Sequence, residues 1–210
     1  MIPLKDDIRS LHPPVATLVL IAVLIGLAAS GWQPALQEMP WPVAAVLASL
    51  LTAGIVQLAV NGLFLWLFGR SVEGSIGAIG LIGVYLLGAL AFAAAGELAG
   101  DWPVPAIGGA GGVAAVIAAH CMLYPGARII CFVVIPFFFT FIELPAVLLA
   151  AIWLGLQAVP AIGDTAGAAF PGDAGVSVAA LAAAVAIGVV AAAVVRSRGL
   201  PRLDSGQPAY

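Results

Sequence analysis

The sequence predicts an all-α membrane protein, a bundle of six transmembrane helices with both termini in the cytoplasm. Of its 210 residues, 63% are hydrophobic and only 8% are charged. A soluble domain carries about 25% charged residues, so this chain lacks the polar side chains to cover a surface that faces water. Its seven Lys and Arg residues are divided among separate loops, which excludes a nucleic-acid-binding surface.

Six apolar segments account for most of the chain, which is expected to form one membrane domain over residues 1–210. A helix needs roughly 20 apolar residues to cross a bilayer, and no segment contains Asp, Glu, Lys or Arg. Helices are expected because lipid cannot satisfy a free backbone. The intervals, such as 31–42 and 69–75, are expected loops. The segments cover about 15–30, 43–68, 76–95, 104–123, 144–159 and 174–195.

The basic residues predict the orientation of these segments. With six spans, all seven basic residues fall on one side of the membrane, and loops rich in Lys and Arg stay in the cytoplasm. The expected cytoplasmic side holds Lys5, Arg9, Arg70, Arg128, Arg196, Arg198 and Arg202. The opposite side holds Glu38, Glu97, Asp101, Asp164 and Asp173. One span more or fewer would break this division.

A further apolar run, from Ile129 to Ile142, precedes the fifth segment. It contains Phe132, Phe141 and the three consecutive residues Phe137 to Phe139. We expect a connector that is partly embedded in the membrane, and a docking face for a partner helix is the alternative. Glu143, which follows the run, is expected at the membrane interface.

Polar residues within the apolar segments are candidates for function, because such residues are costly in lipid. Gln57 and Asn61 lie four residues apart and therefore share one face of a helix. His120 follows in the fourth segment, where a packed or interfacial residue is the expectation, rather than a base or a metal ligand. The chain has no CxxC or HExxH spacing, so we expect neither a metal nor a cofactor.

Several stretches resemble the bacterial rhomboid-type intramembrane serine proteases, and together they cover about residues 1–195. The most specific stretch runs from Asn61 to Gly69 and continues with Val72-Glu73 and Gly77. The other similar stretches are Met1 to Asp7, Tyr85 to Gly88, Val104 to Gly111, Tyr124 to Arg128, Leu144 to Ala146 and Trp153 to Gln157. The resemblance implies a helical bundle in the inner (cytoplasmic) membrane of a bacterium.

The resemblance also implies a catalytic apparatus, which this chain lacks. In the family, a Ser in a Gly-x-Ser-Gly motif attacks the peptide carbonyl and a His on the sixth span takes its proton. Here the motif falls on Gly108-Gly109-Ala110-Gly111, so Ala110 occupies the position of the nucleophile. The His falls at Leu181, and the sixth segment contains no His. A second His, which helps to hold the oxyanion, falls on Gln57, and only Asn61 matches.

We therefore expect an inactive rhomboid-like protein that binds transmembrane partners or serves as a subunit of a larger membrane complex. The candidate binding site comprises Gln57, Asn61 and the backbone of Gly108, Gly109 and Gly111. The first outer loop, Gly31 to Pro42, looks shortened, which puts a lateral gate in doubt.

Two alternatives remain. One is an intramembrane protease with a non-standard constellation, which would use one of the hydroxyl groups of Ser49, Thr52, Thr140 and Ser177. The other is a small transporter, which the absence of ionisable residues from the spans disfavours.

Overall fold

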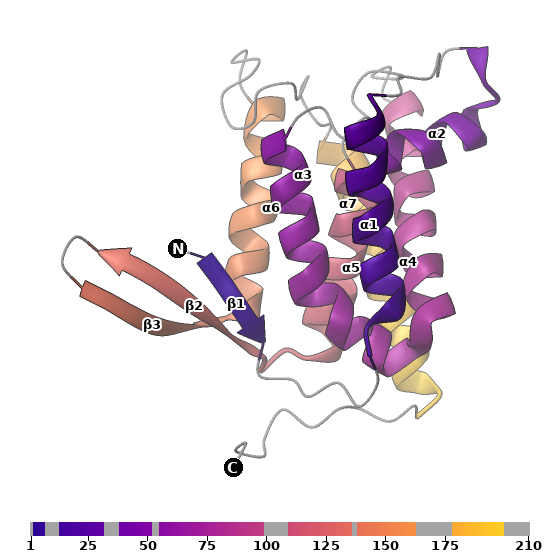
Figure 1. Ribbon diagram of the computed structural model, residues 1–210. Coiled ribbons are helices and arrows are strands. Elements are labelled where there is room, and N and C mark those ends of the chain that lie inside the picture. Colours follow the sequence, from indigo (N-terminus) through magenta and orange to yellow (C-terminus); the bar gives the residue numbers. More distant parts are fainter. Residues whose placement is uncertain are drawn as a thin grey trace.

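A computed structural model describes residues 2–6, 13–31, 38–51, 55–98, 109–135, 138–162 and 178–199. Six helices stand side by side in one bundle (Figure 1): α1 (Val15–Ser30), α3 (Ile55–Phe64), α4 (Arg70–Leu98), α5 (Ala110–Leu123), α6 (Ala146–Ile162) and α7 (Val178–Ser197). We call the end at which α5 begins the head end, and the end at which α5 stops the foot end. Helix α2 (Trp41–Leu50) lies at the head end, and a π-helix, η2 (Leu65–Gly69), joins α3 to α4.

Helix α5 forms the centre of the bundle. Every residue from Ala110 to His120 is buried, and the most extensive helix contacts are those among α4, α5 and α7. Glycines permit this close approach. A Cβ atom on Gly188 would lie 2.1 Å from the carbonyl oxygen of Ala115, and one on Gly88 would lie 2.3 Å from the Ala115 Cβ. In lipid, the hydrophobic effect does not draw helices together, and small residues stabilise the bundle because they allow the helices to pack closely.

The long helical stretch from Ile55 to Leu98 folds back on itself at Gly77. This residue has a φ of 77° and a ψ of 170°, a conformation that favours glycine. Each of the two arms retains the roughly 20 residues that a bilayer crossing needs. Within the described ranges, Ile55–Leu98 and Val178–Ser197 are long and apolar enough to span a membrane, and the other apolar helices are shorter.

Glu73 joins the first arm of this hairpin to the start of α1. Helix α1 begins after Pro14 without a side-chain cap of its own, so its first backbone N–H groups need an outside acceptor. The Glu73 carboxylate accepts from the backbone nitrogens of Ala16 and Thr17, both at 2.8 Å, and from the Thr17 hydroxyl at 2.7 Å. The carboxylate is buried, and its negative charge lies at the positive end of the helix dipole.

The second expected span, 43–68, is divided between two helices. Helix α2 ends at Leu50, Leu51 has an extended backbone (φ −85°, ψ 152°), and α3 begins at Ile55. Both parts are apolar, so hydrophobicity alone does not separate them. The connection from α1 to α3 therefore runs over residues 31–54 and contains α2. The expectation of a shortened outer loop, Gly31 to Pro42, was wrong.

The third, fourth and sixth segments also differ from their expected bounds. The interval 69–75 is helical, and the turn comes later, at Gly77. The expected loop was wrong, because this interval packs against α1: a Cβ on Gly69 would lie 3.1 Å from the Thr17 hydroxyl oxygen, and Glu73 accepts hydrogen bonds from the start of α1. Helix α5 begins at Ala110 and α7 at Val178, and the expected residues before them, 104–108 and 174–177, lie outside the described ranges.

The all-α prediction was wrong at the foot end, where three strands form an antiparallel sheet of order β1-β2-β3. The strands are β1 (Ile2–Asp6), β2 (Arg128–Ile135) and β3 (Phe138–Pro145). Ile2 pairs with Phe132, and Arg128 pairs with Pro145. The run that forms β2 and β3 is rich in β-branched and aromatic residues, which favour strands. A short apolar run of this kind cannot be assigned to helix or strand by its periodicity.

We predict that Glu73→Gln lowers the free energy of unfolding by about 2–4 kcal/mol, because the amide replaces one acceptor oxygen by a donor that faces N–H groups. Thermal unfolding in detergent micelles measures this loss. Glu97→Gln is the matched control, because Glu97 is exposed near the other end of the same helix. Equal effects of the two substitutions would contradict the capping role.

Gly188→Ala should also destabilise the bundle, by about 2–3 kcal/mol, because its new methyl group would overlap the Ala115 carbonyl. Gly155→Ala on α6 is the control, since a Cβ there meets nothing within 4 Å. Steric trapping or SDS unfolding in mixed micelles gives both values. A Gly188→Ala variant as stable as Gly155→Ala would show that α7 does not approach α5 this closely.

Candidate functional site

The candidate site lies at the head end, where α5 begins beside α3. Gln57 and Asn61 are buried on α3, and Asn61 is only 1% exposed. Gly109 precedes α5 with a left-handed φ of 69°. A Cβ on this glycine would lie 2.8 Å from the Ser49 carbonyl oxygen and 3.3 Å from the Asn61 Nδ2. The Asn61 amide therefore lies against Gly109, the residue that precedes α5.

Tyr85 and Ser49 lie next to Gly109 in the same site. The Tyr85 hydroxyl donates to the Ser49 carbonyl oxygen at 2.7 Å, which ties α4 to the last turn of α2. The Tyr85 ring also packs against Gly112, where a Cβ would lie 2.6 Å from a ring carbon. Sequence reasoning named Ser49 only as an available hydroxyl and did not select Tyr85, because neither contact is local in sequence.

The start of α5 presents backbone donors to this region. No side chain caps the helix, and the Gly109 carbonyl accepts the first intrahelical bond, from Val113, at 3.1 Å. The N–H groups of the first turn, which include those of Ala110 and Gly111, have no acceptor within the helix. They lie at the positive end of the helix dipole. This arrangement suits a carbonyl oxygen or another acceptor. Gly108, which was also expected here, lies outside the described ranges.

A model of the rhomboid family, described as Rhomboid domain, matches residues 37–198. The chain belongs to the rhomboid family. It is therefore a multi-pass membrane protein, as its composition predicted, and the resemblance noted in the sequence is confirmed at the level of the family. Comparisons with curated proteins and with solved structures give no match.

In this rhomboid-family chain, the positions that the resemblance assigns to Ser and His lie on neighbouring helices. Ala110 is the first residue of α5, and Leu181 lies in the first turn of α7, which packs along α5. Both side chains are buried. Each contributes only alkyl groups, and α7 carries no His within Val178–Ser197. The polar groups described at this site are the Asn61 amide, the Tyr85 hydroxyl and the backbone N–H groups at the start of α5, and all of them can form hydrogen bonds.

Sequence reasoning did not select two buried residues of α6 that carry polar groups. Trp153 packs against Phe64 of α3, with ring centroids 5.6 Å apart, and within the described structure its buried indole N–H has no acceptor. Gln157, one turn further along α6, is also buried. A polar residue in an apolar segment is a candidate by the rule that selected Gln57, and that rule identifies Gln157 too.

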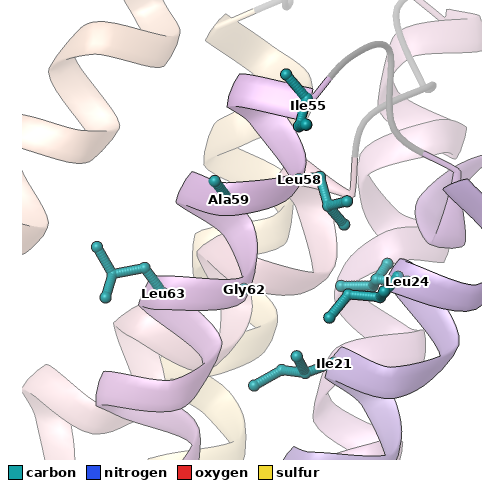
Figure 2. Close-up of a pocket in the computed structure, with 8 residues that line it drawn as sticks. Ile21, Leu24, Ile55, Leu58, Ala59, Gly62 and Leu63 are labelled. Atoms are coloured by element: carbon teal, nitrogen blue, oxygen red, sulfur yellow. The ribbon is translucent and has the colours of Figure 1, made fainter. Parts of the chain in front are cut away.

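An apolar groove of about 300 Å³ lies between α1 and α3 (Figure 2). Its described lining is aliphatic throughout and includes Ile21, Leu24, Leu58 and Leu63. A groove of this composition offers no group for acid–base or nucleophilic chemistry.

A second polar pair, Ser71 and His120, lies toward the foot end. The Ser71 hydroxyl oxygen is 2.6 Å from His120 Nδ1, and these residues are 1% and 0% exposed. The Ser71 hydroxyl also donates to the Phe68 carbonyl oxygen at 3.0 Å, so its single proton is engaged and its oxygen is free to accept from Nδ1. His120 is therefore a packed residue, with Phe68 edge-on to its ring at 4.8 Å.

The Ser71–His120 pair is separate from the head-end site. His120 lies ten residues along α5 from Ala110, which is about 15 Å along the helix axis. A second contact at the foot end, between the hydroxyls of Ser75 and Tyr124, joins the same parts of the chain. The pair therefore ties the first turns of α4 to the last turn of α5.

We predict that Ser71→Ala destabilises the protein by about 1–3 kcal/mol, because it leaves both imidazole nitrogens of His120 buried without a partner. Ser197→Ala should be nearly neutral, since the Ser197 hydroxyl makes only an exposed contact within its own helix. Thermal unfolding in micelles compares the two variants. If Ser71→Ala were as stable as the wild type, the Ser71–His120 pair would not hold α4 against α5.

Proposed function

We propose that this rhomboid-family protein is a pseudoprotease that binds transmembrane segments of other membrane proteins, or serves as an accessory subunit of a larger membrane complex. The observation that carries the proposal is Ala110 at the start of α5, directly after Gly109, which lies against the Asn61 amide. Peptide hydrolysis by this family's route needs a hydroxyl nucleophile and an imidazole base. A methyl group at residue 110 and an isobutyl group at Leu181 supply neither.

The polar groups that remain support a binding role. Asn61 lies against Gly109 at the start of α5, and α6 carries two further buried polar side chains, Trp153 and Gln157. In lipid, a transmembrane segment with a broken helix or a polar side chain has few other partners for its hydrogen-bonding groups. The retained region favours binding of such a segment, without its cleavage.

The proposed membrane arrangement has six spans in the inner membrane of a bacterium, with both termini in the cytoplasm. Arg128 follows the end of α5, and Arg196 lies in the last turn of α7, so both belong to the foot end. Basic residues favour the cytoplasmic side. This orientation directs the head-end site toward the outer leaflet.

Restoring the nucleophile alone should not restore activity. We expect Ala110→Ser to remain unlabelled by a fluorophosphonate probe, because Leu181 still supplies no base. Ala114→Ser, one turn further along α5, is the control for the effect of a new buried hydroxyl on folding. Labelling is read by in-gel fluorescence of the reconstituted proteins. Robust labelling of Ala110→Ser, but not of Ala114→Ser, would mean that a base lies within reach and would contradict the proposal.

A second candidate function is a protease that uses the Ser71–His120 pair, whose 2.6 Å contact is the observation in its favour. The burial of both side chains opposes it, since the packed helices leave neither side chain open to a substrate carbonyl. The same probe separates the two functions. Labelling of the wild type that Ser71→Ala abolishes would establish this candidate in place of the first.

The binding role is tested with a dye-labelled single-span peptide that carries a Gly-Asn break in its outer half. Energy transfer to the labelled protein in liposomes should show association, and Gln57→Leu with Asn61→Leu should weaken it about tenfold, through the loss of two intramembrane hydrogen-bonding groups. Val56→Leu, exposed on the same helix, is the control. Unchanged affinity in the double variant would remove these residues from the binding site.

A further inference from the structure

The apolar groove between α1 and α3 shares one side of its helix with two residues nearer the foot end. Its α3 lining includes Ile55, Ala59 and Gly62, at spacings of four and three residues. Trp66 and Arg70 follow at spacings of four, and the backbone stays helical through η2, with φ −57° and ψ −47° at Arg70. Residues three or four apart are neighbours on one side of a helix. Trp66 and Arg70 therefore continue the line of the groove toward the foot end.

Helix α1 runs beside this line over its whole length. Figure 2 shows Ile21 pointing toward α3, and a Cβ on Gly62 would lie 3.9 Å from the Ile21 Cγ2. Nearer the foot end, Thr17 of α1 packs against Gly69 of η2. The seam between α1 and the α3–η2 helix is therefore continuous from the groove to the foot end.

Arg70 supplies a positive charge at the foot end of this seam. Its guanidinium carbon lies 4.8 Å from the centre of the Trp66 ring. Within the described ranges Arg70 forms no ion pair, and the nearby Glu73 carboxylate already accepts hydrogen bonds from the start of α1. The planar guanidinium of Arg is suited to phosphate, and Trp is typical of the membrane interface. The pair is thus suited to a phosphate group at the level of the headgroups.

We propose that this seam binds one anionic phospholipid of the leaflet at the foot end, with its phosphate on Arg70 and one acyl chain in the groove. Gly62 and Ala59 precede Arg70 by 8 and 11 residues, which is about 12 and 16 Å along the helix axis. Half of the hydrocarbon core of a bilayer is about 15 Å thick, so an acyl chain reaches this part of the groove.

The composition of the seam favours a lipid over a partner helix. The described lining of the groove is aliphatic throughout, so it holds no polar group that would orient a helix, and an acyl chain needs none. Basic sites beside transmembrane helices are suited to anionic headgroups. The inference depends neither on the absence of protease activity nor on which end of the bundle faces the cytoplasm.

Native mass spectrometry of the full chain tests the proposal. The protein is released from micelles that hold equal amounts of phosphatidylglycerol and phosphatidylcholine with the same acyl chains, and the lipids that stay bound are counted. Arg70→Gln removes the charge at the site, and Arg196→Gln removes an exposed charge in the last turn of α7. Ala59→Phe fills the groove, and Val56→Phe places the same ring at an exposed position of α3 outside it.

We expect the wild type, Arg196→Gln and Val56→Phe to retain one phosphatidylglycerol, with a preference of about fivefold over phosphatidylcholine. Arg70→Gln should lose this preference, and Ala59→Phe should retain less of both lipids. Equal retention by the two Arg variants, or by the two Phe variants, would overturn the proposal. A lipid-free dimer that Ala59→Phe separates into monomers would also overturn it, because a second copy of the chain would then cover the groove.

Photocrosslinking of the wild-type chain gives a readout that needs no variant. Phosphatidylglycerol with a diazirine in the middle of one acyl chain is irradiated with the protein in liposomes, and peptide mass spectrometry locates the adducts. The adducts should concentrate in residues 21–25 of α1 and 55–63 of α3. Adducts spread evenly over the exposed sides of α1, α6 and α7 would show that the lipid has no defined site.

Discussion

The close approach of α7 and α4 to α5 is the constraint on which the rest of the structure depends. At Gly188 and Gly88 there is no room for a side chain, because the backbone and the methyl group of Ala115 occupy the space. This contact surrounds α5 with protein and fixes the position of its first turn. The first turn in turn brings Gly109 against Asn61 and the Tyr85 hydroxyl. A bundle held by small residues in this way keeps the geometry of its head-end site whether or not that site performs chemistry.

This independence would allow a rhomboid fold to persist without a catalytic pair, as we propose for this chain. Ala110 and Leu181 are buried apolar residues, so they fit the interior of the bundle with no polar group to satisfy. The interactions that hold the fold lie elsewhere. Glu73 binds the start of α1, Ser71 and His120 join α4 to α5, and Tyr85 holds the end of α2. None of these contacts requires a hydroxyl at residue 110 or an imidazole at residue 181.

The sequence was sufficient to predict a helical membrane protein, the family and the bounds of α1. It also predicted that Gln57 and Asn61 lie on the same face of one helix. Composition and the spacing of residues a few positions apart are enough to predict those features. The division of 43–68, the turn at Gly77 and the three-stranded sheet were not predicted, because apolar runs do not reveal where a helix ends or a strand begins. Contacts such as Glu73 with Thr17, 56 residues apart, leave no local pattern. Gln157 is the exception: its signal was present in the sequence, a polar residue within an apolar segment.

The most direct test of the central claim is turnover by the wild-type protein. The purified chain is reconstituted in liposomes with single-span reporter proteins, and intact mass spectrometry follows every reporter over time. The account predicts that the reporters stay intact while they associate with the protein, because residue 110 offers no nucleophile. Accumulation of fragments cut within the membrane, in proportion to the amount of protein and abolished by a single substitution in it, would contradict the account.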